Sequence, residues 1–172
     1  MNKQKIGGRK MTSERLLKEL NDQFNFELLS GYYYMAMASY CDSENMSGFA
    51  HFLQEQAKEE YEHAMKFYEF LNDIDGRVTM QAMVEPKNDY SSFLEVFQAA
   101  LHHEELVTSK IHNLLDIAKE ENDYPTLQFL QWFIAEQVEE EASMKDIIFK
   151  LEGIDGKFQG LYLLDKELAR RE

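Results

Sequence analysis

Apolar residues recur at spacings of three and four along four long stretches of the chain and one short stretch, which is the period of an amphipathic α-helix. We expect helices at roughly 13–41, 46–73, 92–121, 125–152 and 159–170. No stretch shows the sustained alternation of a strand. The pattern therefore predicts an all-α fold.

Residues at the ends of these stretches match the residue preferences of helix ends. Ser92 followed by Glu95 is a capping-box pattern at the start of the third helix, and Pro125 suits the first turn of the fourth. Gly76 and Gly153 are expected to stop the second and fourth helices.

The connections between the stretches predict the topology. The links at 41–45 and 121–125 are short enough only for antiparallel neighbours. The link at 75–91 has no helical period, and ~16 extended residues reach ~50 Å, which exceeds the ~40 Å length of a ~27-residue helix. We expect it to run the length of the bundle, so that the second and third helices are parallel. The prediction is a four-helix bundle with one long crossover and a short fifth C-terminal helix at 158–170.

Composition narrows the class of protein. A length of 172 residues, 44% hydrophobic and 29% charged, fits one soluble domain spanning 1–172, with 1–12 as a flexible tail. The formal charge of −14 repels phosphate backbones and attracts cations, which disfavours nucleic acid as a partner. Cys41, the single cysteine, cannot form an internal disulfide, and we see neither an export signal nor a membrane span. A cytoplasmic protein is expected.

Each long helix carries an acid on its apolar stripe, where a core residue belongs. The acids are Glu27, Glu60, Glu104 and Glu140, and His63 follows Glu60 by three residues. Taken singly, a mid-helix glutamate more often lies at the solvated edge of a bundle. Four acids at similar depth favour convergence in the interior.

Converging carboxylates need compensating positive charge, because a buried unpaired carboxylate costs several kcal/mol. The four stripes contain no Lys or Arg, so metal ions are the remaining compensator. Four carboxylates balance two divalent cations, and the spacing of Glu60 and His63 lets both ligate one ion. One histidine among oxygen ligands suits iron or manganese, with zinc as a tight-binding competitor. Di-iron carboxylate bundles are a known instance of this arrangement and provide its template.

Six segments carry a resemblance to a known family. They are 25–29 (NFELL), 59–63 (EEYEH), 103–107 (HEELV), 124–133 (YPTLQFLQWF), 136–140 (EQVEE) and 160–168 (GLYLLDKEL). With these segments the chain resembles the bacterial non-haem ferritins over roughly 12–170. The resemblance implies an iron storage protein with ferroxidase activity. Such a protein oxidises Fe(II) with O2 or peroxide and deposits Fe(III) oxide inside a homo-oligomeric shell of twenty-four subunits.

The resemblance also implies roles for individual residues. The first iron would be held by Glu27, Glu60 and His63, and the second by Glu60, Glu104 and Glu140, with Glu60 bridging. Gln137 would lie beside them, and Tyr34 would lie close enough to act as a hydrogen-bond or electron donor, as would Trp132. A third iron position would involve Glu59, Glu136, Glu139 and Glu140. A run of three glutamates at 139–141 usually faces solvent, which weighs against that third position.

Two departures separate the chain from neighbouring families. Ser143 stands where rubrerythrins and bacterioferritins would have the histidine of a second Glu-x-x-His, and Tyr61 stands where bacterioferritins would have a haem-ligating methionine. No haem is expected, although Met46 and Met65 are possible ligands. A rubrerythrin-like di-iron peroxidase remains an alternative, as does a DNA-protecting mini-ferritin that would use the basic residues of the N-terminal tail, which are Lys3, Lys5, Arg9 and Lys10.

Overall fold

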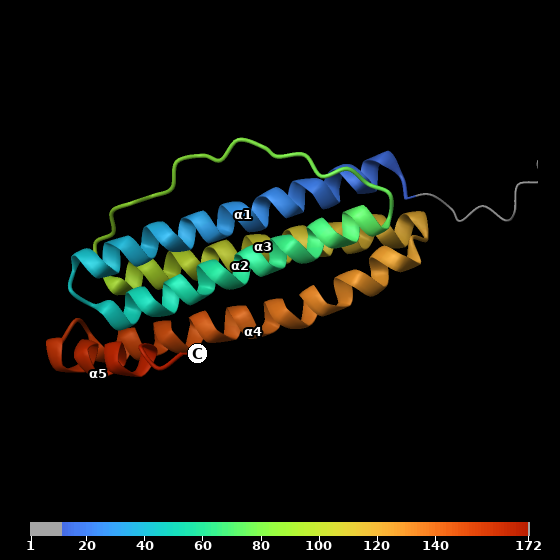
Figure 1. Cartoon of the computed structure of the whole chain (residues 1–172). Helices are drawn as coiled ribbons and strands as arrows, with labels where there is room; N and C mark the ends of the chain where they lie inside the picture. The colour runs from blue at the N-terminus through green and yellow to red at the C-terminus, as the bar shows by residue number, and fades with distance from the viewer. Residues whose placement is uncertain (1–11, 172) are drawn as a thin grey trace, which may run out of the picture.

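The computed structural model describes residues 12–171 as a bundle of four long helices with a fifth across one end (Figure 1). The helices are α1 (Glu14–Ser43), α2 (Ser47–Asp73), α3 (Phe93–Glu121), α4 (Tyr124–Ile154) and α5 (Phe158–Leu168). Each lies within three residues of its predicted bounds. The predicted architecture is confirmed. The basic tail lies outside the described residues, apart from Thr12, whose hydroxyl donates to Asp123 Oδ2 at 2.9 Å.

Helix ends follow local capping chemistry, with three corrections to the sequence prediction. Ser92 accepts from the Glu95 amide at 3.1 Å as expected, but the Glu95 carboxylate returns to the Ser91 amide at 2.6 Å instead of the Ser92 amide. Gly153 does not stop α4, which continues to Ile154 and ends at Asp155 with φ 51°. An aspartate tolerates this left-handed conformation better than most residues do.

Gly76 also acts differently from the prediction. The left-handed residue after α2 is Asp75, with φ 63°, and Gly76 donates its amide to the Leu71 carbonyl at 2.8 Å. A Cβ at Gly76 would lie 2.9 Å from a methyl carbon of Leu17. A larger residue would force the Leu17 side chain to move, so the glycine allows close packing against α1.

The crossover between α2 and α3 runs along the outside of α1, and α2 and α3 point the same way (Figure 1). Two asparagines of α1 hold it. Asn21 Oδ1 accepts from the Thr79 amide at 2.7 Å, and Asn25 Oδ1 accepts from the Gln81 amide at 2.8 Å. Both asparagines donate in return to the Thr79 carbonyl. These side chains satisfy backbone groups that have no helix or sheet partner.

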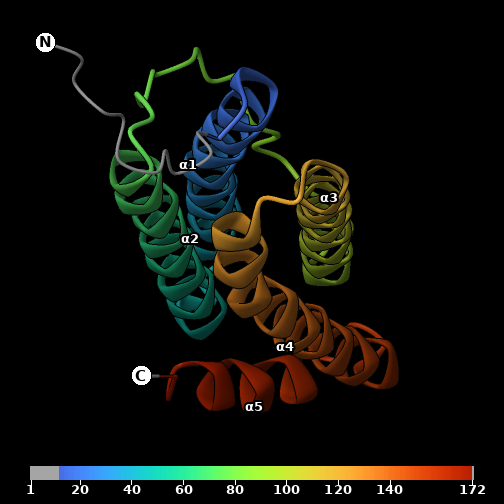
Figure 2. The same ribbon diagram turned by 90° about the vertical axis from the view of Figure 1, so that its right-hand side faces the viewer.

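Helix α5 crosses the end of the bundle below α2 and α4 (Figure 2). The buried Asp165 accepts from the amides of Gly48 at 2.6 Å and Phe49 at 3.2 Å, at the start of α2. Met46 precedes α2 and provides no side-chain cap, so α5 supplies the missing acceptor. A Cβ at Gly48 would meet the Asp165 carbonyl oxygen at 1.8 Å, which makes this contact specific to glycine.

The apolar core is divided into two layers along the bundle. One layer, which includes Phe49, Phe97 and Leu151, lies toward α5. The other, which includes Phe67 and Phe133, lies at the opposite end. The four predicted acids fall between them, so the layers close both ends of a polar centre. Over residues 12–171, none of the helices combines the length and apolar character needed to cross a membrane.

Candidate metal centre

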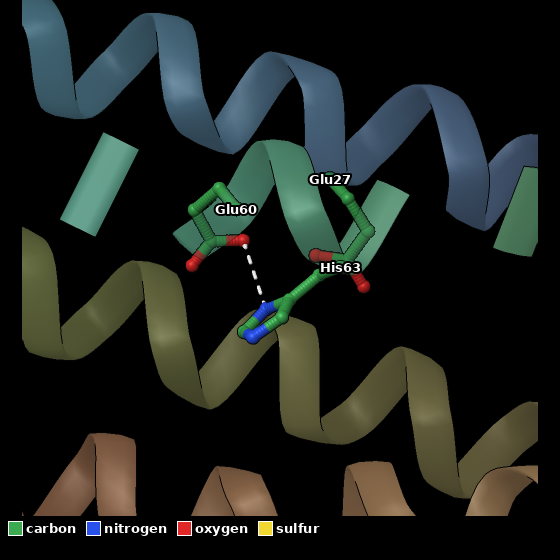
Figure 3. Close-up of side chains that lie close together, drawn as sticks. All are labelled: Glu27, Glu60 and His63. Atoms are coloured by element: carbon green, nitrogen blue, oxygen red, sulfur yellow. Dashed lines mark ion pairs between the residues drawn. The ribbon is translucent and has the colours of Figure 1, made fainter. Parts of the chain in front are cut away.

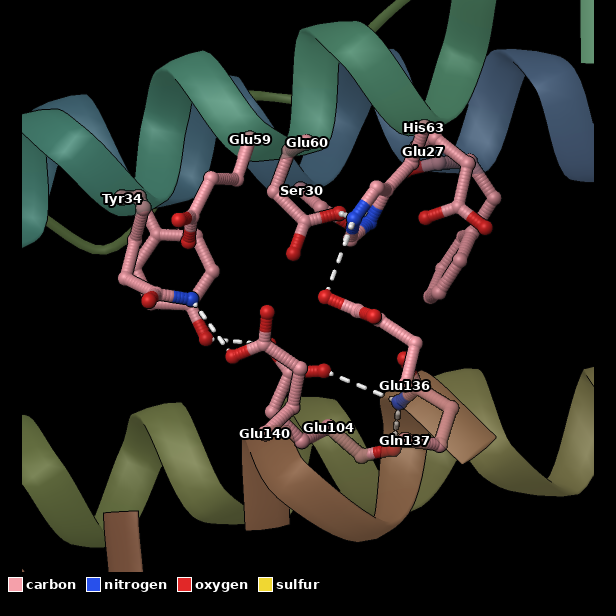
Figure 4. A network of polar contacts seen from close by, with 12 residues as sticks. Glu27, Ser30, Tyr34, Glu59, Glu60, His63, Glu104, Glu136, Gln137 and Glu140 are labelled. Carbon is pink, nitrogen blue, oxygen red and sulfur yellow. Dashed lines mark hydrogen bonds and ion pairs between the residues drawn. The ribbon is translucent and has the colours of Figure 1, made fainter. Parts of the chain in front are cut away.

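All four helices of the bundle contribute a buried acid to the level between the two apolar layers (Figure 4). Relative exposure is 0% for Glu27, 1% for Glu60, 0% for Glu104 and 5% for Glu140. His63, on the same face of α2 as Glu60, is 4% exposed. The carboxylates are therefore removed from water, as the stripe pattern predicts.

Glu27, Glu60 and His63 form a compact group (Figure 3), with one potential ligand atom from each lying within 4.8 Å of the others. Glu60 Oε2 lies 3.6 Å from His63 Nδ1. Gln23, one turn before Glu27, donates to Glu27 Oε1 at 2.8 Å. Glu27 Oε2 and Glu60 Oε2 are buried without a hydrogen-bond partner. Buried oxygens of this kind are rare unless an ion or ordered water meets them, so this donor set fits a cation.

Glu104 and Glu140, on α3 and α4, receive hydrogen bonds from neighbouring side chains. Tyr34 donates to Glu104 Oε1, and Gln137 donates to Glu104 Oε2 at 3.0 Å. Gln56 donates to Glu140 Oε2 at 2.9 Å, while its own amide oxygen is buried and unpartnered. These donors hold the two carboxylates in defined positions.

Burial shifts the pKa of every acid in the centre in the same direction. It raises the pKa of Glu27 well above its usual range, and the charge of Glu60 adds to the shift. Burial and the charge of Glu104 raise the pKa of Glu60 likewise, and burial raises that of Glu104 against the opposing hydrogen bonds from Tyr34 and Gln137. For Glu140, burial and then the charge of Glu104 raise the pKa to about 7. In the absence of a cation these carboxyl groups favour holding protons, and a divalent ion would displace them.

Comparisons with known proteins agree with this geometry. The model of the Ferritin-like domain matches residues 17–154. The chain belongs to the ferritin family. It is 46% identical to the bacterial non-heme ferritin of Staphylococcus aureus (strain MRSA252) over 161 residues, covering 94% of this chain and 97% of that one. It is 44% identical, with the same coverage, to the corresponding protein of Staphylococcus epidermidis.

Solved ferritin structures also match the fold. An open-pore ferritin from the archaeon Archaeoglobus fulgidus superposes with a TM-score of 0.92 at 44% identity. The match covers 93% of this ferritin chain and 99% of the archaeal one.

Of the acids expected at a third position in this ferritin, Glu136 and Glu140 belong to one possible ligand group, whereas Glu59 and Glu139 do not. Glu136 Oε1 lies 3.9 Å from His63 Nε2, and Glu136, His63 and Glu140 form a second possible ligand group. Glu59 instead pairs with Arg171 at 2.5 Å, and Glu139 is exposed. Neither of the ligand groups found among residues 12–171 contains Glu59 or Glu139.

Aromatic residues lie beside the candidate metal centre of this ferritin. The Tyr34 ring is 1% exposed, and the Trp132 ring lies 5.3 Å from the His63 ring in an edge arrangement. His103 hydrogen-bonds to Ser30 Oγ at 2.7 Å, and burial lowers the pKa of His103 to about 4. This histidine is therefore neutral near pH 7 and adds no positive charge beside Glu104.

Sequence reasoning predicted Gln137 beside the acids but missed the supporting amides of Gln23 and Gln56. Gln56 precedes Glu60 by four residues on the same stripe, as Gln23 precedes Glu27. A glutamine one turn before Glu27 and before Glu60 was a usable signal. The partner of Gln56 was not predictable, because it bonds to Glu140 on another helix.

Proposed function

We propose that this ferritin binds two Fe(II) ions as substrates between its four helices and oxidises them with O2 or peroxide. Glu27, Glu60 and His63 hold the first ion. Glu60, Glu104 and Glu140 hold the second, with Gln137 beside it. The observation that carries the proposal is the pair of buried, unpartnered oxygens on Glu27 and Glu60.

The chemistry of the donor set supports iron as the substrate. Carboxylates and one imidazole suit iron or manganese better than thiolate-preferring metals. Carboxylates can also change between terminal and bridging binding as each ion loses one electron and gains charge. The hydrogen bonds from Tyr34, Gln137 and Gln56 orient the second pair of acids and limit how far they move.

The product Fe(III) then leaves for storage as oxide. This chain is an iron storage protein with ferroxidase activity, as its family membership indicates. A closed shell retains the mineral, and we propose a homo-oligomer of 24 subunits in the cytoplasm. The exposed apolar side chains of α5, Phe158 at 70% and Leu163 at 69%, support burial against other copies.

We also propose a third iron position on the flank of the centre, using Glu59, Glu136, Glu139 and Glu140, and no haem. Glu136 supports the third position by its place beside His63. The absence of haem is supported by Tyr61, which follows Glu60 and is 57% exposed, because a tyrosine there replaces the expected methionine ligand.

Aerobic titration of the metal-free protein with Fe(II) tests the main proposal. We expect rapid oxidation up to two Fe(II) per chain, followed by slower oxidation with the iron retained in a large assembly on size-exclusion chromatography. Manganese(II) added under the same conditions is the control for a response that any divalent ion would cause. Absence of fast oxidation would contradict the ferroxidase centre, whereas oxidation by a monomer or small oligomer would contradict storage in a shell.

A further inference from the structure

The last described residue of the chain returns to the metal centre. Arg171 lies three residues beyond α5, and its Nη2 donates to Glu59 Oε2 at 2.5 Å. Glu59 directly precedes Glu60, and its carboxylate extends from α2 toward α4 (Figure 4). The C-terminal segment therefore places a positive charge on the flank of the centre.

Several contacts hold Arg171 in this position. Its carbonyl oxygen is 2.8 Å from His51 Nε2, and its guanidinium carbon lies 4.3 Å from the centroid of the Phe52 ring. The side chain is 23% exposed, and Nη1 is buried without a hydrogen-bond partner. Stacking and the backbone anchor reduce the freedom of a side chain that would otherwise lose much rotamer entropy on pairing.

The Glu59–Arg171 pair affects metal binding because one carboxylate cannot fully neutralise a guanidinium and a metal ion at the same time. A guanidinium bonded to Oε2 neutralises the carboxylate and repels a divalent ion that approaches it. Within residues 12–171, neither Glu136, Glu139 nor Glu140 forms an ion pair with an arginine or a lysine. Of the four acids on the flank, Glu59 is therefore the one that is paired with a positively charged side chain within residues 12–171.

We propose that Arg171 is a positioning residue that competes with the third iron ion for Glu59 and thereby weakens retention of that ion. This inference rests on the proposed third position. An ion that leaves the buried centre toward Glu59 has to displace the guanidinium, and the guanidinium returns when the ion moves on. Weak binding at this position favours transfer over trapping.

Binding of Zn²⁺ to the metal-free, full-length assembly tests the inference without iron oxidation. Isothermal titration of wild type, Arg171→Gln and Arg170→Gln compares loss of the paired guanidinium with loss of an exposed neighbouring one. We expect Arg171→Gln to tighten only the weakest class of Zn²⁺ sites, by about two- to fivefold, which is the size expected for a partly exposed ion pair. Arg170→Gln removes the same net charge, and it should change the Zn²⁺ affinity of that class only by the small amount that this lost charge causes.

Two further observations separate charge competition from a structural role. Arg171→Lys keeps the positive charge and should retain the weak wild-type affinity, and added salt should reduce the difference between wild type and Arg171→Gln. Anomalous diffraction at the zinc edge should show higher occupancy beside Glu59 in Arg171→Gln than in Arg171→Lys. Equal affinities in these two variants would overturn the inference, as would equality of Arg171→Gln with Arg170→Gln.

Glu59→Gln distinguishes this inference from the proposal beneath it. We expect the substitution to weaken or remove the weakest class of sites while the tighter classes remain. An unchanged weakest class would reject Glu59 as a ligand and with it the third position. If Glu59→Gln removes the weakest class of sites but Arg171→Gln has no effect, the third position is supported. Only the competition by Arg171 is then rejected.

Discussion

The glutamates at and beside the metal centre of this ferritin fall into two groups that differ in how their charge is compensated. Within the centre, Glu27 and Glu60 are almost completely buried and each has an oxygen with no hydrogen-bond partner. On the flank, Glu139 is exposed and Glu59 pairs with an arginine. Glu59 directly precedes Glu60 on α2, and Glu139 directly precedes Glu140 on α4, so burial and bonding partners separate the two groups, not sequence distance.

This difference predicts strong binding inside and weak binding outside. A buried carboxylate without a partner gains most from a cation, because it has already lost its hydration. An exposed or paired carboxylate gains little, because water or the arginine already stabilises its charge. The arrangement therefore suits oxidation at fixed ligands followed by release through looser ones.

The largest expected effect comes from removing an inner ligand. Glu60→Ala and His63→Ala should each lower the initial rate of Fe(II) oxidation by at least about 100-fold, since even loss of a residue that only supports a metal ligand costs ~10–100-fold. Stopped-flow absorbance measures the rate. Glu62→Ala, an exposed glutamate on the same helix, is the matched control and should oxidise normally. Similar rates in all three variants would remove the distinction between the two groups of acids.

The next effect is on the pH dependence of stability without metal. The pKa of Glu140 is raised from 4.5 to about 7, so its stabilising contribution is fully present below pH 4.5 and is lost as pH rises through 7. This loss amounts to up to about 3 kcal/mol at 1.36 kcal/mol per pKa unit. Thermal unfolding between pH 5 and 8 should show a steeper decline for the metal-free wild type than for Glu140→Gln. Parallel profiles would show that Glu140 is not buried as a proton-holding group.

A smaller effect follows from Tyr34, which supports an inner acid without being one of the iron ligands. Tyr34→Phe leaves Glu104 Oε1 without its donor, and a buried acceptor left unpaired costs ~1–3 kcal/mol. We expect a lower unfolding temperature and an oxidation rate reduced by about tenfold. Tyr32→Phe removes the same hydroxyl from a 47% exposed position on α1 and should change neither quantity. Equal behaviour of the two variants would contradict the role of Tyr34.

The smallest effect should separate the flank acids from one another. Glu136 lies near His63, whereas Glu139 is exposed. Glu136→Gln should weaken the loosest class of Zn²⁺ sites severalfold, and Glu139→Gln should weaken it by only about twofold, because an exposed carboxylate contributes less to ion binding. Calorimetric titration measures both. A larger effect at Glu139 would mean that metal binding turns this side chain inward.

Much of the fold was predictable because helical period is a local property. The stripes placed five helices within three residues of their observed bounds, and the length of the link at 75–91 predicted the parallel arrangement of α2 and α3. The prediction is wrong at Gly153, because α4 continues through this glycine to Ile154. Asp155 and Gly156 adopt the left-handed conformation instead.

The sequence by itself determined which helices form and that each long one turns an acid inward, because both follow from residue spacing along one helix. Only the tertiary structure decided the partners of those acids and of the helix ends. Gln56 reaches Glu140, Asp165 caps α2, and Arg171 meets Glu59 across 112 positions of the chain. Such contacts depend on the relative rotation and depth of packed helices, which no spacing within a single helix specifies.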